Sequence, residues 1–534
     1  MKIKAVVTLG LFGALTAILA ANPAFKQKVV NEAHHLQRST YRRGEGVQAR
    51  VGWPRENPPR PLPARPVSFP PYEIRKLANG MQVVLVSQNE QPAISVRLIV
   101  RTGAALDPKG KYGLAMMTAS LLDQGAGNRT AEQIADTIDF IGGALGTGAG
   151  TDLSFVNAVV MKDSYDVALD LISDIVQHPT FTQEEIERQR AQALSALKVA
   201  ADDPGAVADR VINRLIYGFH PYGMPGAGTT ESLAAMTRED FVDFHKKYFV
   251  PNNALIAVVG DITAADAMAG LEKHFGAWKP GDIPAANVTD PPDATKRVVV
   301  IDKKGAVQTE IRVGQIAIPR KHADFEAIDQ AVKILGGEGA NRLQQVLRSQ
   351  KQLTYGASAD LDVFKFSGAV IAETDTQTPN TAEAVRVVLD EFARLQRERV
   401  SDGELEGAQD YMVGHFPLTI EVPDAIATQV LNQLFYELPV EDLPRYRERI
   451  MKVTPDEFQR VAKWFLRPSQ LSVVLVGDAD KFVNDLKGIG LCAYERIPIE
   501  RIDLLSADLM KKPTRAAFAT PPSAVASARP AVAR

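Results

Sequence analysis

The chain has 534 residues, of which 45% are apolar and 23% charged, and its formal net charge is −3. This length exceeds what one hydrophobic core accommodates, so we expect two to four domains. The near-neutral charge gives no electrostatic basis for binding nucleic acid or an anionic membrane surface. The single cysteine, Cys492, excludes an internal disulfide and a zinc site built mainly from cysteines.

The N-terminus has the pattern of a secretory signal at residues 1–21. The basic stretch MKIK precedes 17 uncharged residues, AVVTLGLFGALTAILAA, which end in small side chains. This pattern predicts export. Leu19 stands where a small residue is preferred, so the cleavage signal is weak, and an uncleaved segment 5–21 would be a marginally long membrane anchor. We expect a periplasmic protein that is either released or tethered to the inner membrane.

Two segments of biased composition flank the rest of the chain. Residues 22–71 are polar and then proline-rich, which is typical of a semi-rigid spacer. Residues 507–534 are rich in Ala, Pro and Ser with few large apolar side chains, which predicts a disordered tail.

The first half of the remaining chain mixes predicted strands with amphipathic helices. Apolar runs predict strands at 81–88, 93–104 and 152–162, and helical spacing predicts helices at Thr130–Ile141 and 163–177. In the first helix, Ile134, Ile138 and Ile141 share one face. Between this helix and the strand that follows, Gly142, Gly143 and Gly146 of IGGALGTGAG predict a turn.

The second half repeats this scheme. Strands are predicted for KRVVVIDKK (296–304), TEIRVGQIAI (309–318) and the stretch 354–375, and a helix is predicted through Ala331–Leu335. Strands that cluster before runs of helices are typical of an α+β fold. We therefore predict two α/β sandwich domains.

Matching segments at a nearly constant offset indicate that these domains arose by duplication. A helix start at Thr237, then Pro251 and the strand LIAVVGD, recur 217 residues later as Thr454, Pro468 and LSVVLVGD. Thr182-Gln-Glu-Glu and Ser401-Asp-Gly-Glu match at an offset of 219. All four helix starts offer a capping hydroxyl, and three have a Glu three residues later that suits a reciprocal cap. We predict homologous domains at 72–285 and 286–506.

An ordered set of motifs runs through both domains. It comprises NGMQVVLV (79–86), RTGAALDPKGKYGLA (101–115), ADDP (201–204), HPYG (220–223), YFVPNNALIAVVGD (248–261) and LGGEGANRLQQVLRSQKQLTYG (335–356). Over about residues 72–490 the set resembles the insulinase/pitrilysin family of zinc metallopeptidases, especially its bacterial, processing-peptidase-like branch. The resemblance implies the duplicated sandwich fold and a peptide substrate.

The resemblance also implies a zinc site, and this chain lacks its side chains. In active members the helix after Gly-Leu-Ala carries His-x-x-Glu-His, and a second glutamate completes the ligands. Here the two histidine positions fall on Met116 and Ser120, the glutamate base on Ala119, and the third ligand on or near Ala196. Alanine has no donor atom, serine is a poor zinc ligand, and a thioether prefers softer metals. We expect no metal in this chain.

No histidine pair elsewhere restores the motif. The adjacent His34 and His35 lie in the leader region, where a solvated role is the simpler interpretation. The other histidines are scattered along the chain: His178, His220, His245, His274, His322 and His415.

The family resemblance implies a second feature, an arginine and a tyrosine from the C-terminal domain that hold the substrate backbone and stabilise the oxyanion. These positions correspond to Arg348 and to Tyr355, which we expect to begin a strand. Alternatively, Arg348 could complement a helix dipole and Tyr355 could belong to the core. Gly336, Gly337 and Gly339 lack the lysine of a phosphate-binding loop and instead favour close helix packing or a substrate-facing loop.

Two functions from different classes follow from these residues. The first is a non-catalytic subunit that pairs with a zinc-carrying homologue and supplies Arg348 and Tyr355 for peptide hydrolysis. The alternative is an inactive scaffold or peptide-binding assembly protein. An active hydrolase with relocated ligands is a third, less favoured hypothesis.

Overall fold

The computed structural model describes residues 67–285, 288, 290–291, 296–337 and 341–511. The predicted signal or anchor, most of the spacer and the tail after Lys511 lie outside these residues. Phe69 is buried, so packing begins within the predicted spacer. The packed chain also continues five residues into the predicted tail, because the apolar side chain of Leu509 is fully buried. No helix among the described residues is long and apolar enough to cross a membrane.

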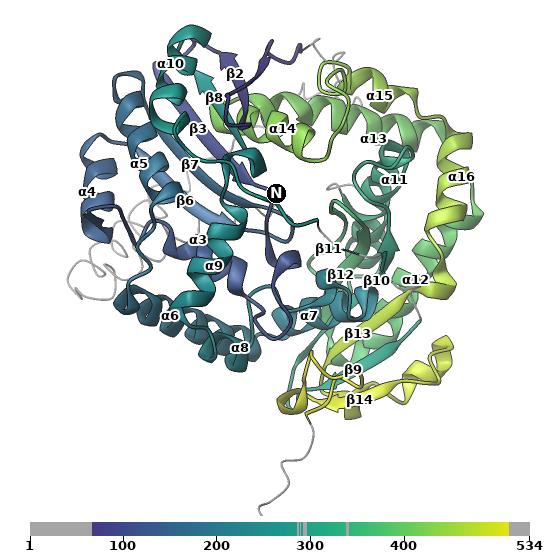
Figure 1. The fold of residues 1–534 in the computed structure, drawn as a ribbon. Coiled ribbons are helices and arrows are strands. Elements are labelled where there is room, and N and C mark those ends of the chain that lie inside the picture. Colours follow the sequence, from purple (N-terminus) through teal and green to yellow (C-terminus); the bar gives the residue numbers. More distant parts are fainter. Residues whose placement is uncertain (1–66, 286–287, 289, 292–295, 338–340, 512–534) are drawn as a thin grey trace, which may run out of the picture. The chain divides into compact units, whose positions relative to one another are not determined.

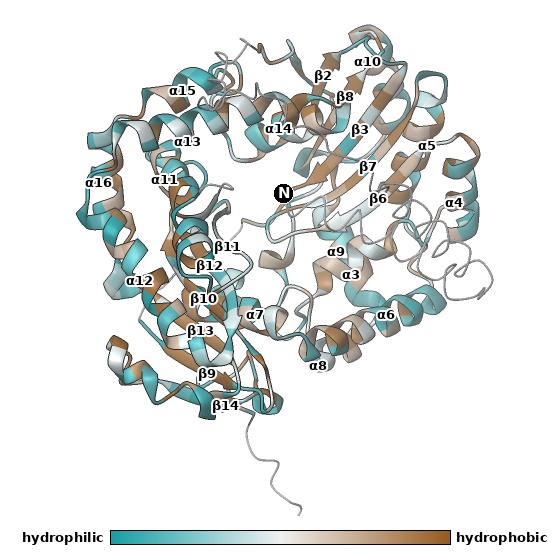
Figure 2. Ribbon diagram, turned by 180° about the vertical axis from the view of Figure 1, so that it is seen from behind, coloured by the Kyte–Doolittle hydropathy of each residue, from teal (hydrophilic) through white to brown (hydrophobic). Residues whose placement is uncertain are grey.

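The N-terminal half contains a six-stranded sheet in the described part of the chain (Figure 1). Its strands, in spatial order, are β1 (Glu73–Lys76), β2 (Gln82–Ser87), β8 (Ala254–Gly260), β3 (Ala93–Val100), β7 (Ser154–Met161) and β6 (Ala144–Ala149). A small hairpin of β4 (Gly125–Ala126) and β5 (Arg129–Thr130) lies apart from it. Figure 2 shows that the central strands of the six-stranded sheet are apolar, and such strands are expected to be buried on both faces of the sheet.

The C-terminal half contains a second six-stranded sheet among the described residues. Its order is β11 (Ala357–Val363), β12 (Gly368–Gln377), β10 (Gln308–Ala317), β13 (Ser472–Gly477), β9 (Val298–Asp302) and β14 (Glu495–Pro498). The pair β9–β13 is parallel, as is β2–β8, and the next three pairs towards β11 and β6 are antiparallel in both sheets. Five strands of each sheet therefore match in order and direction, which confirms the predicted duplication. The remaining edge strands differ, because β1 is antiparallel to β2 whereas β14 is parallel to β9.

Helices are interleaved with the strands along both halves of the chain. The N-terminal half has α3 (Leu114–Leu121), α4 (Ala131–Phe140), α5 (Tyr165–Gln177), α6 (Gln183–Asp202), α8 (Thr230–Ala234), α9 (Arg238–Tyr248) and α10 (Ala264–Phe275). The C-terminal half has α11 (Phe325–Val332), α12 (Thr381–Arg397), α13 (Asp402–His415), α15 (Tyr446–Lys452) and α16 (Pro455–Phe465). The predicted reciprocal cap forms at Thr454 and Glu457, whereas the Thr182 side chain makes no capping bond.

Two further helices, α7 (Pro204–Tyr217) and α14 (Pro423–Phe435), are exchanged between the halves (Figure 1). α7 belongs to the N-terminal half in sequence, yet it packs on β10 and β13 of the C-terminal sheet. α14 belongs to the C-terminal half and packs on β3 and β8 of the N-terminal sheet. Each sheet therefore has one of its faces covered by a helix from the other half.

Apolar burial and ion pairs fix both exchanged helices. Ile426 and Val430 of α14 are fully buried in one cluster with side chains of β2, β3 and β8. The Asp424 carboxylate at the start of α14 accepts a hydrogen bond from Arg97 on β3. On the other side, Arg312 of β10 donates to Asp209 of α7 at 2.6 Å. The two halves consequently share their hydrophobic cores.

Candidate functional site

The Gly-Leu-Ala helix α3 keeps a well-built N-terminus. Gly113 precedes it with φ +93°, and an added Cβ would lie 2.9 Å from the Cα of Gly228, so only glycine fits. The Asp107 carboxylate accepts backbone hydrogen bonds from Gly113 at 2.7 Å and Ala115 at 2.8 Å. These bonds satisfy amides that a helix start leaves unpaired. The scaffold of the helix is thus intact.

The positions on α3 that the resemblance assigns to metal ligands carry other side chains. Met116 and Ser120 lie one turn apart and share a helix face. Met116 is 38% exposed, whereas the Ser120 hydroxyl donates to the Met116 carbonyl at 2.8 Å. Ala119, at the position of the glutamate base, is fully buried. The helix face has the right spacing and lacks nitrogen or carboxylate donors.

The residue at the predicted third ligand position, Ala196, does not replace the missing metal ligands of α3. α6 packs against α3, but Ala196 on α6 is exposed and carries no donor atom. Among the described residues, no group of three or more His, Cys, Asp or Glu side chains is arranged to hold a metal ion. The residues present at α3 and α6 therefore do not fit zinc.

Two of the described histidines, His245 and His274, contact residues other than histidine. His245 is partly buried and stacks on Phe249, and its Nε2 lies 2.8 Å from the Val176 carbonyl oxygen. Burial lowers its pKa to about 4, so the imidazole is neutral at physiological pH. His274 forms a hydrogen bond with Asp166 instead of approaching another histidine. His34 and His35 lie outside the described residues.

Arg348 and Tyr355 flank one turn of the C-terminal half. Arg348 lies in a π-helical segment, Gln344–Gln350, and its side chain is exposed. Tyr355 is 86% exposed and precedes β11 by two residues, so it neither begins the strand nor belongs to the core. Among the described residues we find no hydrogen bond from either side chain. Both groups can therefore donate to a bound molecule.

The turn that carries this pair is firmly held. The Gln344 side chain accepts a hydrogen bond from the Ala357 amide at 3.0 Å, and Leu353 donates to the Leu347 carbonyl at 2.8 Å. A second π-helical turn, Lys333–Gly337, packs so closely on β11 that a Cβ on Gly336 would lie 2.1 Å from the Ala359 nitrogen. This confirms close helix packing for Gly336, whereas Gly339 lies outside the described residues. π-helical turns occur often at functional sites.

The N-terminal sheet ends in a strand that sequence reasoning missed. Gly146 lies within β6 and pairs with Asn157 of β7, so the predicted turn is confined to Gly142 and Gly143. In the described part of the chain, β6 has a strand partner on one side only. An open strand edge presents backbone donors and acceptors to an extended peptide.

Comparisons with known proteins decide the family. A model described as Insulinase (Peptidase family M16) matches residues 82–230, and one described as Peptidase M16 inactive domain matches residues 235–412. The chain belongs to the insulinase family. The predicted resemblance is confirmed, and the chain is a metallopeptidase homologue of this family.

Individual relatives agree with this assignment. An uncharacterized zinc protease of Mycobacterium leprae is 26% identical over 350 residues, which cover 65% of this chain and 78% of the relative. A solved M16 inactive domain from Pseudomonas fluorescens is 25% identical with a TM-score of 0.72, covering 76% of this chain and 98% of that one. A chain of Complex III2 from Candida albicans, 14% identical with a TM-score of 0.66 and 78% and 99% coverage, shares the fold.

Asp107, which stands six residues before Gly113 in LDPKGKYGLA, holds the start of α3 through its carboxylate and was not among the residues predicted from the sequence. Burial raises the pKa of its carboxyl from 3.8 to about 7. Between these values the folded chain retains a proton that the unfolded chain releases, so stability falls as the pH rises through this window.

We expect Asp107→Asn to isolate this effect, because asparagine cannot ionise. The stability of the wild type relative to the variant should fall by roughly 2–3 kcal/mol between pH 5 and pH 8. Urea unfolding of both proteins at the two pH values measures the difference. The measured quantity is the free energy of unfolding of the wild type minus that of Asp107→Asn. If this difference stays constant or rises from pH 5 to pH 8, burial does not raise the pKa of the Asp107 carboxyl.

Proposed function

We propose that this chain is the non-catalytic subunit of a two-chain zinc metallopeptidase. A homologous partner would carry His-x-x-Glu-His and the zinc, and this chain would contribute Arg348 and Tyr355. One contrast in the molecule supports the proposal: the metal-ligand positions of α3 carry no suitable donors, whereas Arg348 and Tyr355 are exposed on a well-held turn.

The two side chains suit the recognition of a peptide carbonyl. A guanidinium offers several N–H donors and a phenol offers one O–H donor. Donors aimed at the oxygen where negative charge develops stabilise the transition state of acyl transfer. Arg348 and Tyr355 would therefore bind the scissile carbonyl region of the substrate, and the partner would supply the hydrolytic water.

An extended peptide is the substrate class that we propose. The open edge of β6 could pair with the peptide backbone, which recognises length and conformation more than side chains. Export to the periplasm, with or without a tether through residues 5–21, is part of the proposal and is supported by the N-terminal sequence pattern.

Affinity capture tests the pairing. The tagged full-length chain, expressed in its native host, is purified from membranes and periplasm, and its companions are identified by mass spectrometry. We expect a homologue with His-x-x-Glu-His at near-equal amounts, and we expect the purified pair to hydrolyse peptides. Arg348→Ala should be captured equally well, because this side chain is exposed and makes no hydrogen bond among the described residues.

A different companion would favour the alternative. If the chain forms a stable complex with a protein that has no peptidase motif, the scaffold or peptide-binding function replaces our proposal. In that case Tyr355→Phe should change neither the complex nor its function, whereas a shared active site would assemble normally and lose peptide hydrolysis, because only that site uses the hydroxyl as a donor to an oxyanion.

A further inference from the structure

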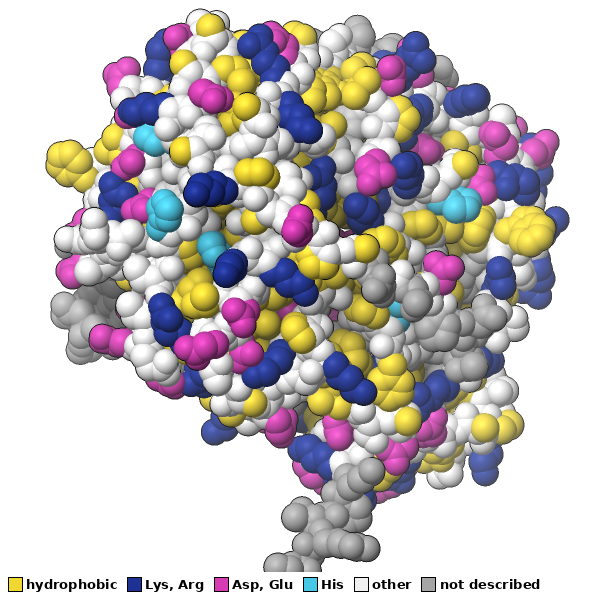
Figure 3. Space-filling view, viewed as in Figure 1, with side chains coloured by type: hydrophobic (Ala, Val, Ile, Leu, Met, Phe, Trp, Pro, Cys, Tyr) yellow, Lys and Arg dark blue, Asp and Glu magenta, His cyan; other side chains and the backbone are white. Residues whose placement is uncertain are grey.

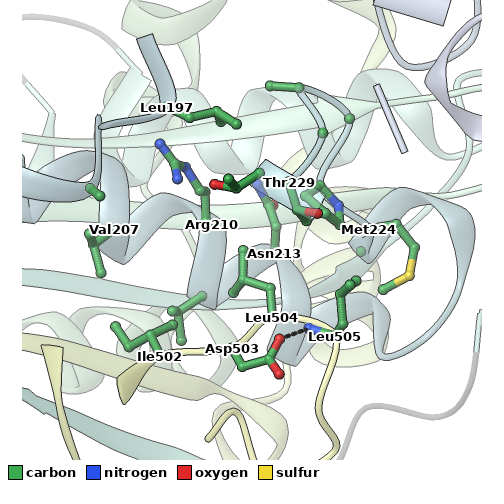
Figure 4. A pocket seen from close by; sticks show the side chains of 18 of the residues that line it. Leu197, Val207, Arg210, Asn213, Met224, Thr229, Ile502, Asp503, Leu504 and Leu505 are labelled. Carbon is green, nitrogen blue, oxygen red and sulfur yellow. Dashed lines mark hydrogen bonds between the residues drawn. The ribbon is translucent and has the colours of Figure 1, made fainter. Parts of the chain in front are cut away.

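A cavity of about 970 Å³ lies beside α7 and shares no lining residue with α3 or with the turn of Arg348 and Tyr355. Its walls come from α6, α7, the segment 221–231 and the C-terminal segment 499–505 (Figure 4). Both halves of the chain therefore contribute to it. The volume lies within the range of small-molecule sites.

One cationic side chain in this cavity has no acceptor among the described residues. Arg210 extends from α7 towards Leu197, on the same side of the cavity as Thr229 (Figure 4). Its side chain is partly buried, and desolvation lowers its pKa. Asn213 lies one helical turn away and also lines the cavity, so its carboxamide adds a second hydrogen-bonding group.

Two carboxylates, those of Asp203 and Asp209, act electrostatically on Arg210 and partly offset the lowering of its pKa, and each accepts a hydrogen bond from another group. Asp209 accepts a hydrogen bond from Arg312 at 2.6 Å, and Asp203 accepts one from the Gly205 amide at 2.8 Å. The other arginine of α7, Arg214, donates to the Leu504 carbonyl at 3.0 Å. Arg210 thus differs from its neighbours, since a partly desolvated guanidinium without an acceptor is costly to maintain.

The remaining walls combine apolar side chains with engaged or exposed charges. Val207, Val211, Met224, Ile502 and Leu504 form an apolar surface. The Asp503 carboxylate accepts the Leu505 amide at 2.9 Å (Figure 4). The lysines of the wall also have partners, because Lys303 donates to the Asp202 carbonyl and Lys511 to the Glu500 carbonyl. The acidic groups Asp202, Glu231, Asp362 and Glu500 are exposed and can remain hydrated.

We propose that this cavity binds an apolar carboxylate, whose charged group pairs with Arg210 while its apolar part contacts the wall formed by Val207, Val211 and Leu504. A guanidinium binds a carboxylate through two parallel hydrogen bonds. Two sources present the same chemistry, a fatty acid and the C-terminal residue of an apolar peptide. The proposal does not depend on the pairing proposed above.

Titration calorimetry on the full chain tests the proposal with matched probes. The acids are decanoate, kept below its micelle concentration, and N-acetyl-Ala-Leu-Phe with a free carboxylate. The controls are decanamide and the same peptide as its C-terminal amide. We expect at least one acid to bind, and its amide to bind about tenfold more weakly or worse. If only decanoate binds, the natural ligand is a fatty acid. If only the peptide acid binds, the natural ligand is the C-terminal residue of a peptide.

Variants distinguish binding in the cavity from nonspecific binding of the acid to the protein surface. Arg210→Gln should weaken binding of the acid at least about tenfold, and Leu505→Trp should weaken it by narrowing the apolar end. Arg386→Gln, on the exposed face of α12 where it pairs with Asp390, should bind like the wild type. The proposal is overturned if neither acid binds at millimolar concentration, or if both cavity variants bind as tightly as the wild type.

Discussion

Arg348→Ala is expected to lower the peptide turnover of the reconstituted pair by about 100-fold to 1000-fold, because removing one well-placed oxyanion donor has an effect of this size. The side chain is exposed and makes no hydrogen bond in the described part of the chain, so its loss should leave the fold unchanged. Steady-state kinetics on the purified pair, with a quenched fluorescent peptide, measures the loss.

A nearby lysine provides the matched control. Lys351 lies three residues away on the same turn and pairs with Glu383 at 2.7 Å, so we give it no role in substrate binding. Lys351→Ala should retain turnover within about threefold, because an exposed ion pair contributes little. If Arg348→Ala and Lys351→Ala behave alike, Arg348 is not a substrate-binding residue and the shared site is wrong.

The isolated N-terminal half, residues 67–285, is expected not to fold stably. Without α14 it exposes the sheet surface that Ile426 and Val430 cover, and its own helix α7 loses the C-terminal sheet. Burying a large aliphatic side chain contributes about 1.5–3 kcal/mol, so several such losses exceed the net stability of an ordinary domain. Circular dichroism and hydrogen exchange of the fragment measure the outcome.

A linked variant makes this test specific. The same fragment carrying residues 416–440 on a flexible linker regains the helix that covers β3 and β8, and it should show protected amides in those strands. The intact chain should unfold in one cooperative transition, because each half contributes to the core of the other. A fragment 67–285 that is fully folded by itself would contradict the exchange of helices as a source of stability.

Local patterns predicted most elements of the fold. The spacing of Ile134 and Ile138 identified α4, and Thr454 with Glu457 identified the start of α16, because periodicity and capping are local properties. The exchange of α7 and α14 was not predictable in this way. The pattern of an amphipathic helix predicts that one of its faces is buried. Which sheet covers that face depends on contacts between residues that are distant in the sequence.

Composition misled at β6, where ALGTGA contains two glycines and favours a turn. Pairing with β7 overrides that preference, and only the structure shows that this strand lies at the sheet edge. The assignment of the zinc-ligand positions to Met116 and Ser120 comes from the family resemblance of the sequence motifs and stays a prediction. The exposure of Tyr355 and the cavity at Arg210 required the packed chain, because both depend on residues distant in sequence.

The metal content and peptidase activity of the solitary chain test the central claim most directly. The purified full-length protein is analysed for zinc by mass spectrometry and assayed with unfolded peptide substrates, before and after treatment with a chelator. We predict far less than one zinc per chain, and no chelator-sensitive hydrolysis until a homologue with His-x-x-Glu-His is added. One bound zinc per chain, together with chelator-sensitive hydrolysis by this chain alone, would contradict the account.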